Sequence, residues 1–177
     1  MALNAYLKAV SPTRGWIKGS VTQKGRENLI KVVRVDHLED RPLDAASFTV
    51  SGNVRHHPFA IAKEVDAASV GLRGSFVANE KFSEWKLQFW RAQLQGAGVG
   101  VEKQHFTVEL TGARVQSIRH VLPDTRDPGF NAWLDFEEIA FVYDRIKWTW
   151  TDGAQSLEEN AQLASPKPLI ARPKRRR

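Results

Sequence analysis

The sequence predicts a mainly β domain that closes into a barrel. Apolar residues occupy every second position between Phe136 and Trp150, as in a strand with one buried face; they are Ile139, Phe141 and Tyr143, then Ile146, Trp148 and Trp150. The alternation changes phase near Asp144, and such a change is typical of a β-bulge or a sharp bend. Because bends of this kind let strands curl around a closed structure, we expect a barrel.

The first half of the chain contains three further predicted strands and a long loop. The strands are Ala2–Val10, Asn28–His37 and Pro58–Val65. The segment Leu38–Arg55 combines charges, a proline and small residues with little periodicity. Loops of this length are uncommon in compact domains unless they are disordered or have a function.

One short helix is predicted after Asp66, whose side chain can cap the first turn. We expect this helix to direct its larger apolar side chains toward the body, namely Val70, Leu72, Phe76 and Val77. Gly71 and Gly74 weaken the prediction because glycine is a poor helix former.

The second half of the chain is more strongly patterned. Trp85, Leu87 and Phe89 alternate along Ser83–Arg91, and Phe106, Val108 and Leu110 alternate along the next predicted strand. The glycine-rich stretch Gly96–Gly100 between them predicts a hairpin turn. Gly112 then interrupts the pattern, and the positions of Val115 and Ile118 predict another change of phase before the Pro123–Pro128 connection.

Length and charge define the domain organisation. The chain has 177 residues, no cysteine and a net charge of +6. The last segment carries all of the excess charge, in Lys167, Arg172, Lys174, Arg175, Arg176 and Arg177. We therefore expect a nearly neutral barrel domain at residues 1–153 and a disordered basic tail at residues 154–177. Such a tail can simply improve solubility, or it can bind polyanions through Lys174, Arg175, Arg176 and Arg177.

The residues that could support catalysis or metal binding form no recognisable motif. The glycine-rich stretch lacks the Lys-Ser/Thr of a phosphate-binding loop. The five histidines, which are His37, His56, His57, His105 and His120, have no zinc-motif spacing. His56 and His57 should point to opposite strand faces, and so should Glu137 and Glu138. We expect no enzyme, no metal site and no cofactor.

The N-terminal segment MALNAYLKAV lacks a basic region followed by a continuous apolar run, and no transmembrane span is predicted. The absence of cysteine fits folding in a reducing compartment. We therefore expect synthesis in the cytoplasm, no membrane insertion, and no cleaved signal peptide.

The ordered set of segments resembles the Hcp family, the haemolysin-coregulated proteins of bacterial type VI secretion systems. The segments that carry the resemblance are MALNAYLK, GSVTQKGRE, DAAS, HPFAIAKEVD, LQFWR and IKWTWTDG, together with Leu110–Ile118. They occur in family order over nearly the whole chain before the tail.

The resemblance implies a barrel of two antiparallel sheets with one side helix, assembled as a hexameric ring. Stacked rings would form a tube inside a contractile sheath, with a spike protein of valine-glycine repeats at its tip, and would be secreted into a target cell. Small effector proteins would be carried in the lumen. It also implies that the long loop reaches the adjacent ring, and we expect the contact residues to be Glu39, Asp40, Arg41, Leu43, Phe48 and Arg55.

Two alternatives remain open at this stage. The long loop could be a solvated surface loop, since charged loops usually are. The protein could also be a small β-barrel that binds nucleic acid or another polyanion through its tail. The neutral body argues against nucleic-acid binding elsewhere, because such a barrel carries a stripe of Lys and Arg along its groove.

Overall fold

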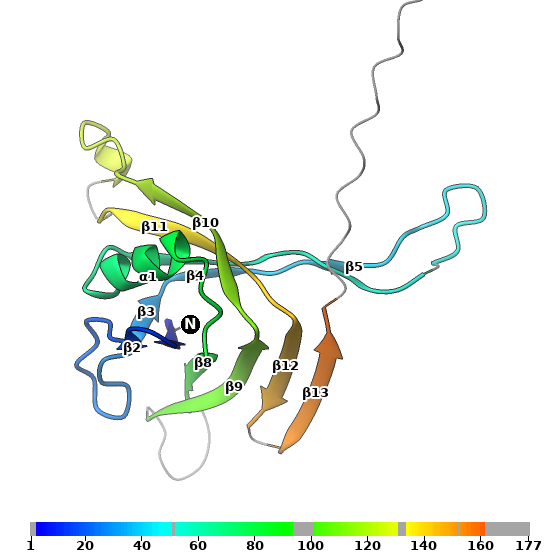
Figure 1. Cartoon of the computed structure of the whole chain (residues 1–177), viewed down its shortest axis with the longest axis horizontal. Coiled ribbons are helices and arrows are strands. Elements are labelled where there is room, and N and C mark those ends of the chain that lie inside the picture. The colour runs from blue at the N-terminus through cyan, green and yellow to red at the C-terminus, as the bar shows by residue number, and fades with distance from the viewer. Residues whose placement is uncertain (1–2, 51, 94–100, 131–133, 152, 162–177) are drawn as a thin grey trace, which may run out of the picture.

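The computed structural model describes residues 3–50, 52–93, 101–130, 134–151 and 153–161, and it consists mainly of antiparallel β-strands (Figure 1). Two sheets curve around a common core, and a two-stranded hairpin projects from them as a long arm. The predicted mainly β class with antiparallel sheets is confirmed.

The larger sheet has seven strands in the order β13-β12-β9-β8-β1-β2, and β3 also pairs with β1. Its strands are β1 (Ala5–Ser11), β2 (Gly15–Ile17), β3 (Ile30–Val32), β8 (Glu84–Ala92), β9 (Glu102–Thr111), β12 (Arg145–Trp150) and β13 (Gln155–Asn160). A row of apolar residues crosses it, because Leu7 lies opposite Leu87, Leu87 opposite Val108, and Val108 opposite Trp148. Side chains in one such row share a face and therefore pack together.

The smaller sheet has four strands in the order β10-β11-β7-β4. They are β4 (Arg34–Asp36), β7 (Phe59–Glu64), β10 (Arg114–Val121) and β11 (Phe136–Val142). The ring of Trp85 joins the two sheets, with its centroid 5.2 Å from that of Phe59 and 5.3 Å from that of Phe141, both in edge-on geometry. Aromatic pairs prefer this arrangement, so the core is both apolar and specifically packed.

The predicted change of phase near Asp144 marks a place where the chain passes from one sheet to the other. At Asp144 it leaves β11 of the smaller sheet and enters β12 of the larger one, so Phe136–Trp150 is two strands rather than one bulged strand. The predicted strand at Asn28–His37 is likewise wrong as a single element, because β3 and β4 lie in different sheets on either side of Val33. Gly112, with a φ of +68°, makes the third such corner.

A true register shift also occurs where the sequence predicted one. The pairing of β10 with β11 slips between Val115 and Ser117. The hairpin between β8 and β9 is confirmed by their antiparallel pairing, whereas the turn residues Gly96–Gly100 lie outside the described residues. A short 3₁₀ turn, η1 (Pro128–Phe130), lies in the connection between β10 and β11.

The predicted helix is α1 (Ala68–Val77); its N-cap position is Ala67, and the side chain of the preceding Asp66 bonds to the first turn. The Asp66 carboxylate accepts a hydrogen bond from the Ala68 N–H at 3.0 Å, and the Ser69 hydroxyl accepts one from the Asp66 N–H at 3.1 Å. This reciprocal pair resembles a capping box.

The predicted inward face of the helix is correct only for Leu72. The buried positions are Ala68, Ser69, Leu72 and Ser75, whereas Val70, Phe76 and Val77 are exposed. Small residues face the sheets because the helix lies very close to them: a Cβ added at Gly71 would stand 2.9 Å from the Ile17 Cγ2 atom. Gly71 thus permits close packing, which outweighs its poor helix propensity.

A buried charge network fixes the start of α1 to the smaller sheet. The Lys63 ammonium group lies 2.8 Å from the Asp66 carboxylate, 2.9 Å from the Ser69 hydroxyl and 3.4 Å from the Glu137 carboxylate. Both Lys63 and Glu137 are 1% exposed. Arg73 of the helix completes the network with a 2.5 Å contact to Glu137.

A buried arginine has a comparable role beneath the segment between β2 and β3. The Arg26 guanidinium lies 4.8 Å from the ring centroid of Tyr6 and 4.2 Å from that of Trp90, and it forms an ion pair with Glu102. Cation–π contacts of this kind are strongest where water is excluded, and Arg26 is only 5% exposed. The GSVTQKGRE segment is therefore ordered by its own arginine.

The boundary of the domain lies later than the sequence predicted. Residues Gln155–Asn160 form β13, which pairs with β12 along its whole length, so the sheet continues beyond residue 153. The sequence pattern does not reveal this strand because five of its six residues are polar, and it lies at an edge of the sheet. The tail residues Lys174, Arg175, Arg176 and Arg177 lie outside the described residues, so their polyanion binding stays a prediction. Within the described chain, no helix has both the length and the apolar character needed to span a bilayer.

Candidate functional site

The arm is the most prominent surface feature of the molecule (Figure 1). It is a hairpin of β5 (Glu39–Asp40) and β6 (Arg55–His56), extended toward its tip by a bridge between Leu43 and Val50. The segment predicted as a long aperiodic loop is thus a paired structure. Its short strands escape detection by periodicity because neither contains enough residues to alternate.

The tip of the arm is shaped by its own polar groups. The Asp44 carboxylate accepts hydrogen bonds from the N–H groups of Ala46 and Ser47 at 2.8 and 3.1 Å. These bonds lower the pKa of Asp44, the bond from Ser47 having the larger effect. The turn is therefore held without any contact to the barrel, as is typical of Asx turns.

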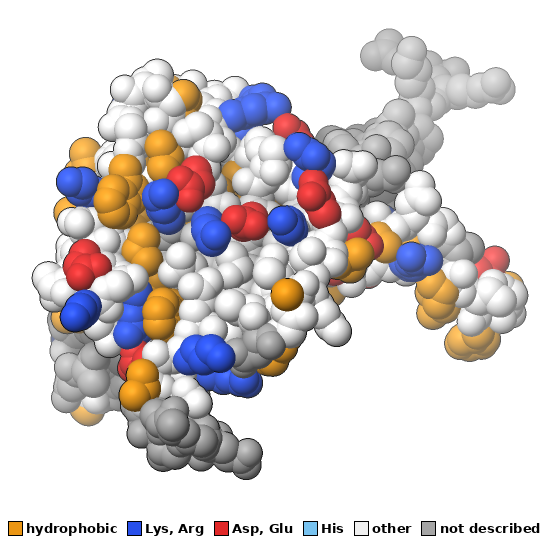
Figure 2. All heavy atoms as spheres, turned by 90° about the horizontal axis from the view of Figure 1, so that it is seen from below, with side chains coloured by type: hydrophobic (Ala, Val, Ile, Leu, Met, Phe, Trp, Pro, Cys, Tyr) orange, Lys and Arg blue, Asp and Glu red, His pale blue; other side chains and the backbone are white. Residues whose placement is uncertain are grey.

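Large apolar side chains are exposed at this tip. Phe48 is 80% exposed, Val50 63% and Leu43 58%. Figure 2 shows hydrophobic side chains gathered near the end of the arm, well away from the body. Exposed apolar groups clustered on a projecting element are typical of a binding surface.

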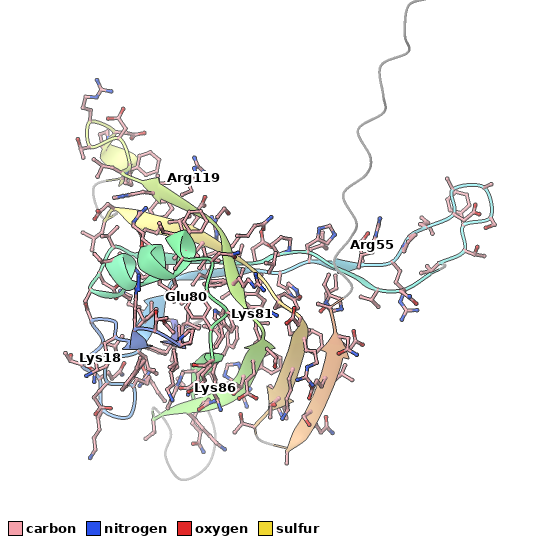
Figure 3. All side chains as sticks on the ribbon, in the orientation of Figure 1. Lys18, Arg55, Glu80, Lys81, Lys86 and Arg119 are labelled. Atoms are coloured by element: carbon pink, nitrogen blue, oxygen red, sulfur yellow. The ribbon has the colours of Figure 1, made fainter. Side chains whose placement is uncertain are left out.

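Ion pairs stiffen the shaft of the arm. Arg55 forms an ion pair with Asp40 across the hairpin, and the His57 Nε2 atom lies 3.0 Å from the same carboxylate. The hydrogen bonds from Arg55 and His57 lower the pKa of Asp40. Figure 3 shows Arg55 at the part of the arm nearest the body, where these contacts form.

The six residues predicted for ring contact therefore divide into four groups. Leu43 and Phe48 are exposed at the tip, Asp40 and Arg55 pair with each other, Glu39 faces the body, and Arg41 lines a pocket at the base. Leu43 and Phe48 can bind a neighbour without breaking an ion pair of the arm. Whether any of the six contacts another ring stays a prediction.

A cluster of polar side chains lies where the arm joins the barrel. Glu39 Oε1 is 3.3 Å from Nδ1 of His56 and 3.9 Å from Nδ1 of His37. The Tyr143 hydroxyl is 2.6 Å from Nε2 of His37, and a Glu159 oxygen is 3.6 Å from Nε2 of His56. His56 is 2% exposed whereas the Glu39 and Glu159 side chains are 34% and 38% exposed, so this cluster lies between the interior and the surface.

Burial determines the protonation of this cluster. Desolvation, with smaller effects from His56 and His57, lowers the pKa of His37 to about 4 and keeps its imidazole neutral. Desolvation also raises the pKa of Glu39 and that of Tyr143. A neutral imidazole has one free lone pair, which makes His37 able to accept a proton donor or a cation.

The sequence analysis missed this cluster. His37 and Glu39 are two residues apart and therefore share a strand face, but His56 reaches them only through the pairing of β5 with β6. The pairing register of that hairpin brings His56 to the other two residues, and the spacing of residues within one strand cannot predict that register. The prediction that His56 and His57 face opposite ways is confirmed, and so is that for Glu137 and Glu138.

The outer face of the larger sheet carries a row of mixed charge. Lys86 lies opposite Glu109, Glu109 opposite Lys147, and Lys147 opposite Glu158 along neighbouring strands. Figure 2, which views this side, shows basic and acidic side chains alternating across the surface. Opposite charges in cross-strand positions stabilise a sheet and leave its face hydrated, with no dominant sign.

The architecture and its projecting arm can now be compared with those of known proteins. Residues 6–150 match the family model described as "Type VI secretion system effector, Hcp". This chain belongs to the Hcp family. The matched residues include the whole arm, α1 and both sheets apart from β13 and the first residue of β1.

Individual relatives agree with this assignment. The Hcp chain is 26% identical over 158 residues to the "Major exported protein" of Pseudomonas aeruginosa, covering 84% of this chain and 90% of that protein. A crystal structure of an Hcp protein superposes with a TM-score of 0.81 at 19% identity, covering 91% of this chain and 99% of the other. The Hcp1 protein of E. coli EAEC 042 superposes with a TM-score of 0.77 at 25% identity, covering 90% and 99%.

Membership of the Hcp family places this chain among the secreted, β-rich proteins of the type VI secretion system. The resemblance inferred from the ordered sequence segments is therefore confirmed.

Proposed function

We propose that this Hcp chain is a structural subunit of the type VI inner tube. Hexameric rings would stack through their arms, and the resulting tube would be propelled into a target cell. The observation that carries the proposal is the arm, which ends in exposed Leu43, Phe48 and Val50 and has a turn ordered by its own hydrogen bonds. Such an arm is preformed for a partner outside the subunit.

The expected energetic contribution of one arm is modest. Full burial of a side chain such as Phe48 stabilises a contact by about 1.5–3 kcal/mol. Because a closed ring repeats each contact around its axis, the contributions of all its arms add. Stacking of rings would therefore be strong even though each contact is weak.

A second surface supports lateral association within the ring. Val70 and Val77 are 78% and 84% exposed on α1, and Phe76 beside them is 41% exposed. These side chains form an apolar face on a helix whose opposite face packs against the barrel. We assign this face to the neighbouring subunit, because monomers rarely keep such residues exposed together.

The same proposal assigns partners and a non-catalytic mechanism. The rings would sit inside a contractile sheath below a valine-glycine-repeat spike, and would carry small effector proteins in the lumen. We place the mixed-charge face of the larger sheet toward that lumen, since a hydrated surface of balanced charge lets cargo bind and leave. The energy for secretion would come from the sheath rather than from this chain.

Substitution of Phe48 tests the arm. Phe48→Asp introduces a charge at the most exposed apolar position of the tip, and Phe48→Tyr is the matched control that keeps the aromatic ring. We expect hexamers of unchanged mass for both variants in light scattering. We expect stacked tubes in electron microscopy, and secretion, to be lost only for Phe48→Asp.

Reversal of Asp40 would be a weaker test because it also breaks the ion pair with Arg55. Wild-type protein that stays monomeric at tens of micromolar would overturn the ring itself. Normal stacking and secretion by Phe48→Asp would instead remove the arm tip from the mechanism and leave the ring intact.

A further inference from the structure

We propose that the cluster at the base of the arm is a zinc site, with His37, Glu39 and His56 as its ligands. The nitrogen or oxygen atoms that these three residues offer all lie within 4.8 Å of one another. The inference concerns the isolated chain and does not depend on ring formation.

Both ring nitrogens of His56 face carboxylates, an arrangement that favours a cation beside the ring. One ring nitrogen faces the Glu39 carboxylate at 3.3 Å, and the other faces the Glu159 carboxylate at 3.6 Å. A neutral imidazole carries a proton on only one nitrogen, so the other would direct a lone pair at a carboxylate. A metal ion between Nδ1 of His56 and Glu39 removes this repulsion, and a proton is the competing solution.

The distances suit a small tetrahedral ion after modest adjustment. Zinc bonds of about 2.0–2.1 Å place neighbouring ligand atoms roughly 3.3 Å apart. His56 Nδ1 and Glu39 Oε1 already have this separation of 3.3 Å, and His37 Nδ1 lies 3.9 Å from the same oxygen. Glu39 is about one-third exposed, so its side chain can move to complete the geometry.

The surrounding groups orient both imidazoles for metal binding through Nδ1. The opposite nitrogen of His37 bonds the Tyr143 hydroxyl at 2.6 Å, and that of His56 faces Glu159 at 3.6 Å. Metal-bound histidines almost always donate their other N–H to such an oxygen. Binding would displace only the 3.3 Å hydrogen bond between the Tyr143 hydroxyl and Nδ1 of His56.

The ligand types favour zinc over the hard cations. Two imidazoles and one carboxylate form a set that zinc uses with water in the fourth position, whereas magnesium and calcium prefer oxygen ligands. A pocket of about 290 Å³ lined by His56, Glu159 and Arg41 connects the cluster with solvent.

A zinc ion here would connect both strands of the arm to the barrel. Glu39 belongs to β5, His56 to β6, and His37 precedes them, while the supporting Tyr143 and Glu159 belong to the barrel. The ion would therefore set the angle at which the arm leaves the body. This gives zinc a structural role in presenting the tip.

Zinc binding by purified full-length protein tests the proposal at neutral pH. We expect one zinc per chain after dialysis, measured by mass spectrometry of the metal, and an affinity measured by competition with a chromophoric chelator. Cobalt should give the visible absorption bands of a four- or five-coordinate site, and magnesium should not compete. Zinc should also slow proteolysis of the arm.

Single substitutions distinguish zinc binding at this cluster from zinc binding at exposed histidines. Glu39→Gln and His37→Gln should each weaken zinc binding at least tenfold, and Glu159→Gln about tenfold or more through its effect on His56. His57→Gln is the matched control, because its side chain lies on the opposite face and contacts Asp40. Glu39→Gln keeps the size of a side chain that is about one-third exposed, and circular dichroism will verify its fold.

Failure of the wild-type protein to bind zinc stoichiometrically would overturn the proposal and leave a proton as the cation at His56. Equal zinc affinity in Glu39→Gln, His37→Gln and the wild type would also overturn it. Loss of binding in His57→Gln alone would assign the metal to the exposed shaft of the arm instead.

Discussion

Removal of the buried Lys63 charge should strongly destabilise the domain. Lys63→Met has a similar length but takes away the ammonium group that contacts Asp66, Ser69 and Glu137. Breaking a buried ion pair costs about 3–5 kcal/mol, because the remaining charge stays buried without its partner. We expect about 3 kcal/mol here, since Glu137 keeps its 2.5 Å contact with Arg73.

A double-mutant cycle makes this magnitude testable. Glu137→Met should cost less, roughly 2 kcal/mol, because Lys63 retains Asp66 at 2.8 Å. The double variant removes both buried charges and should cost about 2 kcal/mol, well below the sum of the two single effects. Apolar replacement of a whole pair avoids the unpaired charge that each single variant creates.

Urea unfolding measures these differences. With an m-value of about 2 kcal/mol/M, Lys63→Met should lower the midpoint by about 1.5 M without a change in slope. All variants must be compared at one protein concentration, with their mass checked by light scattering, because association also stabilises the folded state. Single effects that add to within about 0.5 kcal/mol would refute the network, since independent sites behave in that way.

Three further predictions follow from other contacts. Burial alone would raise the pKa of Glu137, but Ser69, Lys63 and Arg73 together lower it below 4.5. The charged Glu137 carboxylate therefore stabilises the fold fully above pH 4.5, and this stabilisation is lost as the pH falls through the lower pKa of the folded state. Glu137→Gln should flatten the dependence of the urea midpoint on pH below 4.5. Gly71→Ala should destabilise the domain by about 1 kcal/mol, because overpacking against the buried Ile17 outweighs the gain in helix propensity. Gly74→Ala is the control: the added methyl group meets the flexible Arg14 side chain, so this variant should be neutral or stabilising in the same assay. Arg26→Met should cost about 2 kcal/mol by removing a buried ion pair and two cation–π contacts, and thermal unfolding should show no such loss for the exposed control Arg126→Met.

The periodic parts of the chain were predictable because each strand must bury one face. The alternation of Trp85 with Leu87, and of Val108 with Leu110, is imposed locally by the barrel core and appears in the sequence as such. The helix start was also predictable, since the hydrogen bonds of Asp66 involve only the next three residues. The faces of the helix were not, because Gly71 and Ser75 face inward where Ile17 and the sheets leave room only for small side chains.

The sequence by itself determined the fold class, the family and the presence of a bend near Asp144. These properties depend on local periodicity and on the order of segments, and both survive in a single sequence. Only the tertiary structure decided that Phe136–Trp150 is shared between two sheets, that the segment before His56 is a hairpin, and that His37, Glu39 and His56 meet. Each depends on pairing between residues distant in the chain, whose register is set by cross-strand hydrogen bonds and core packing rather than by the pattern of either strand alone.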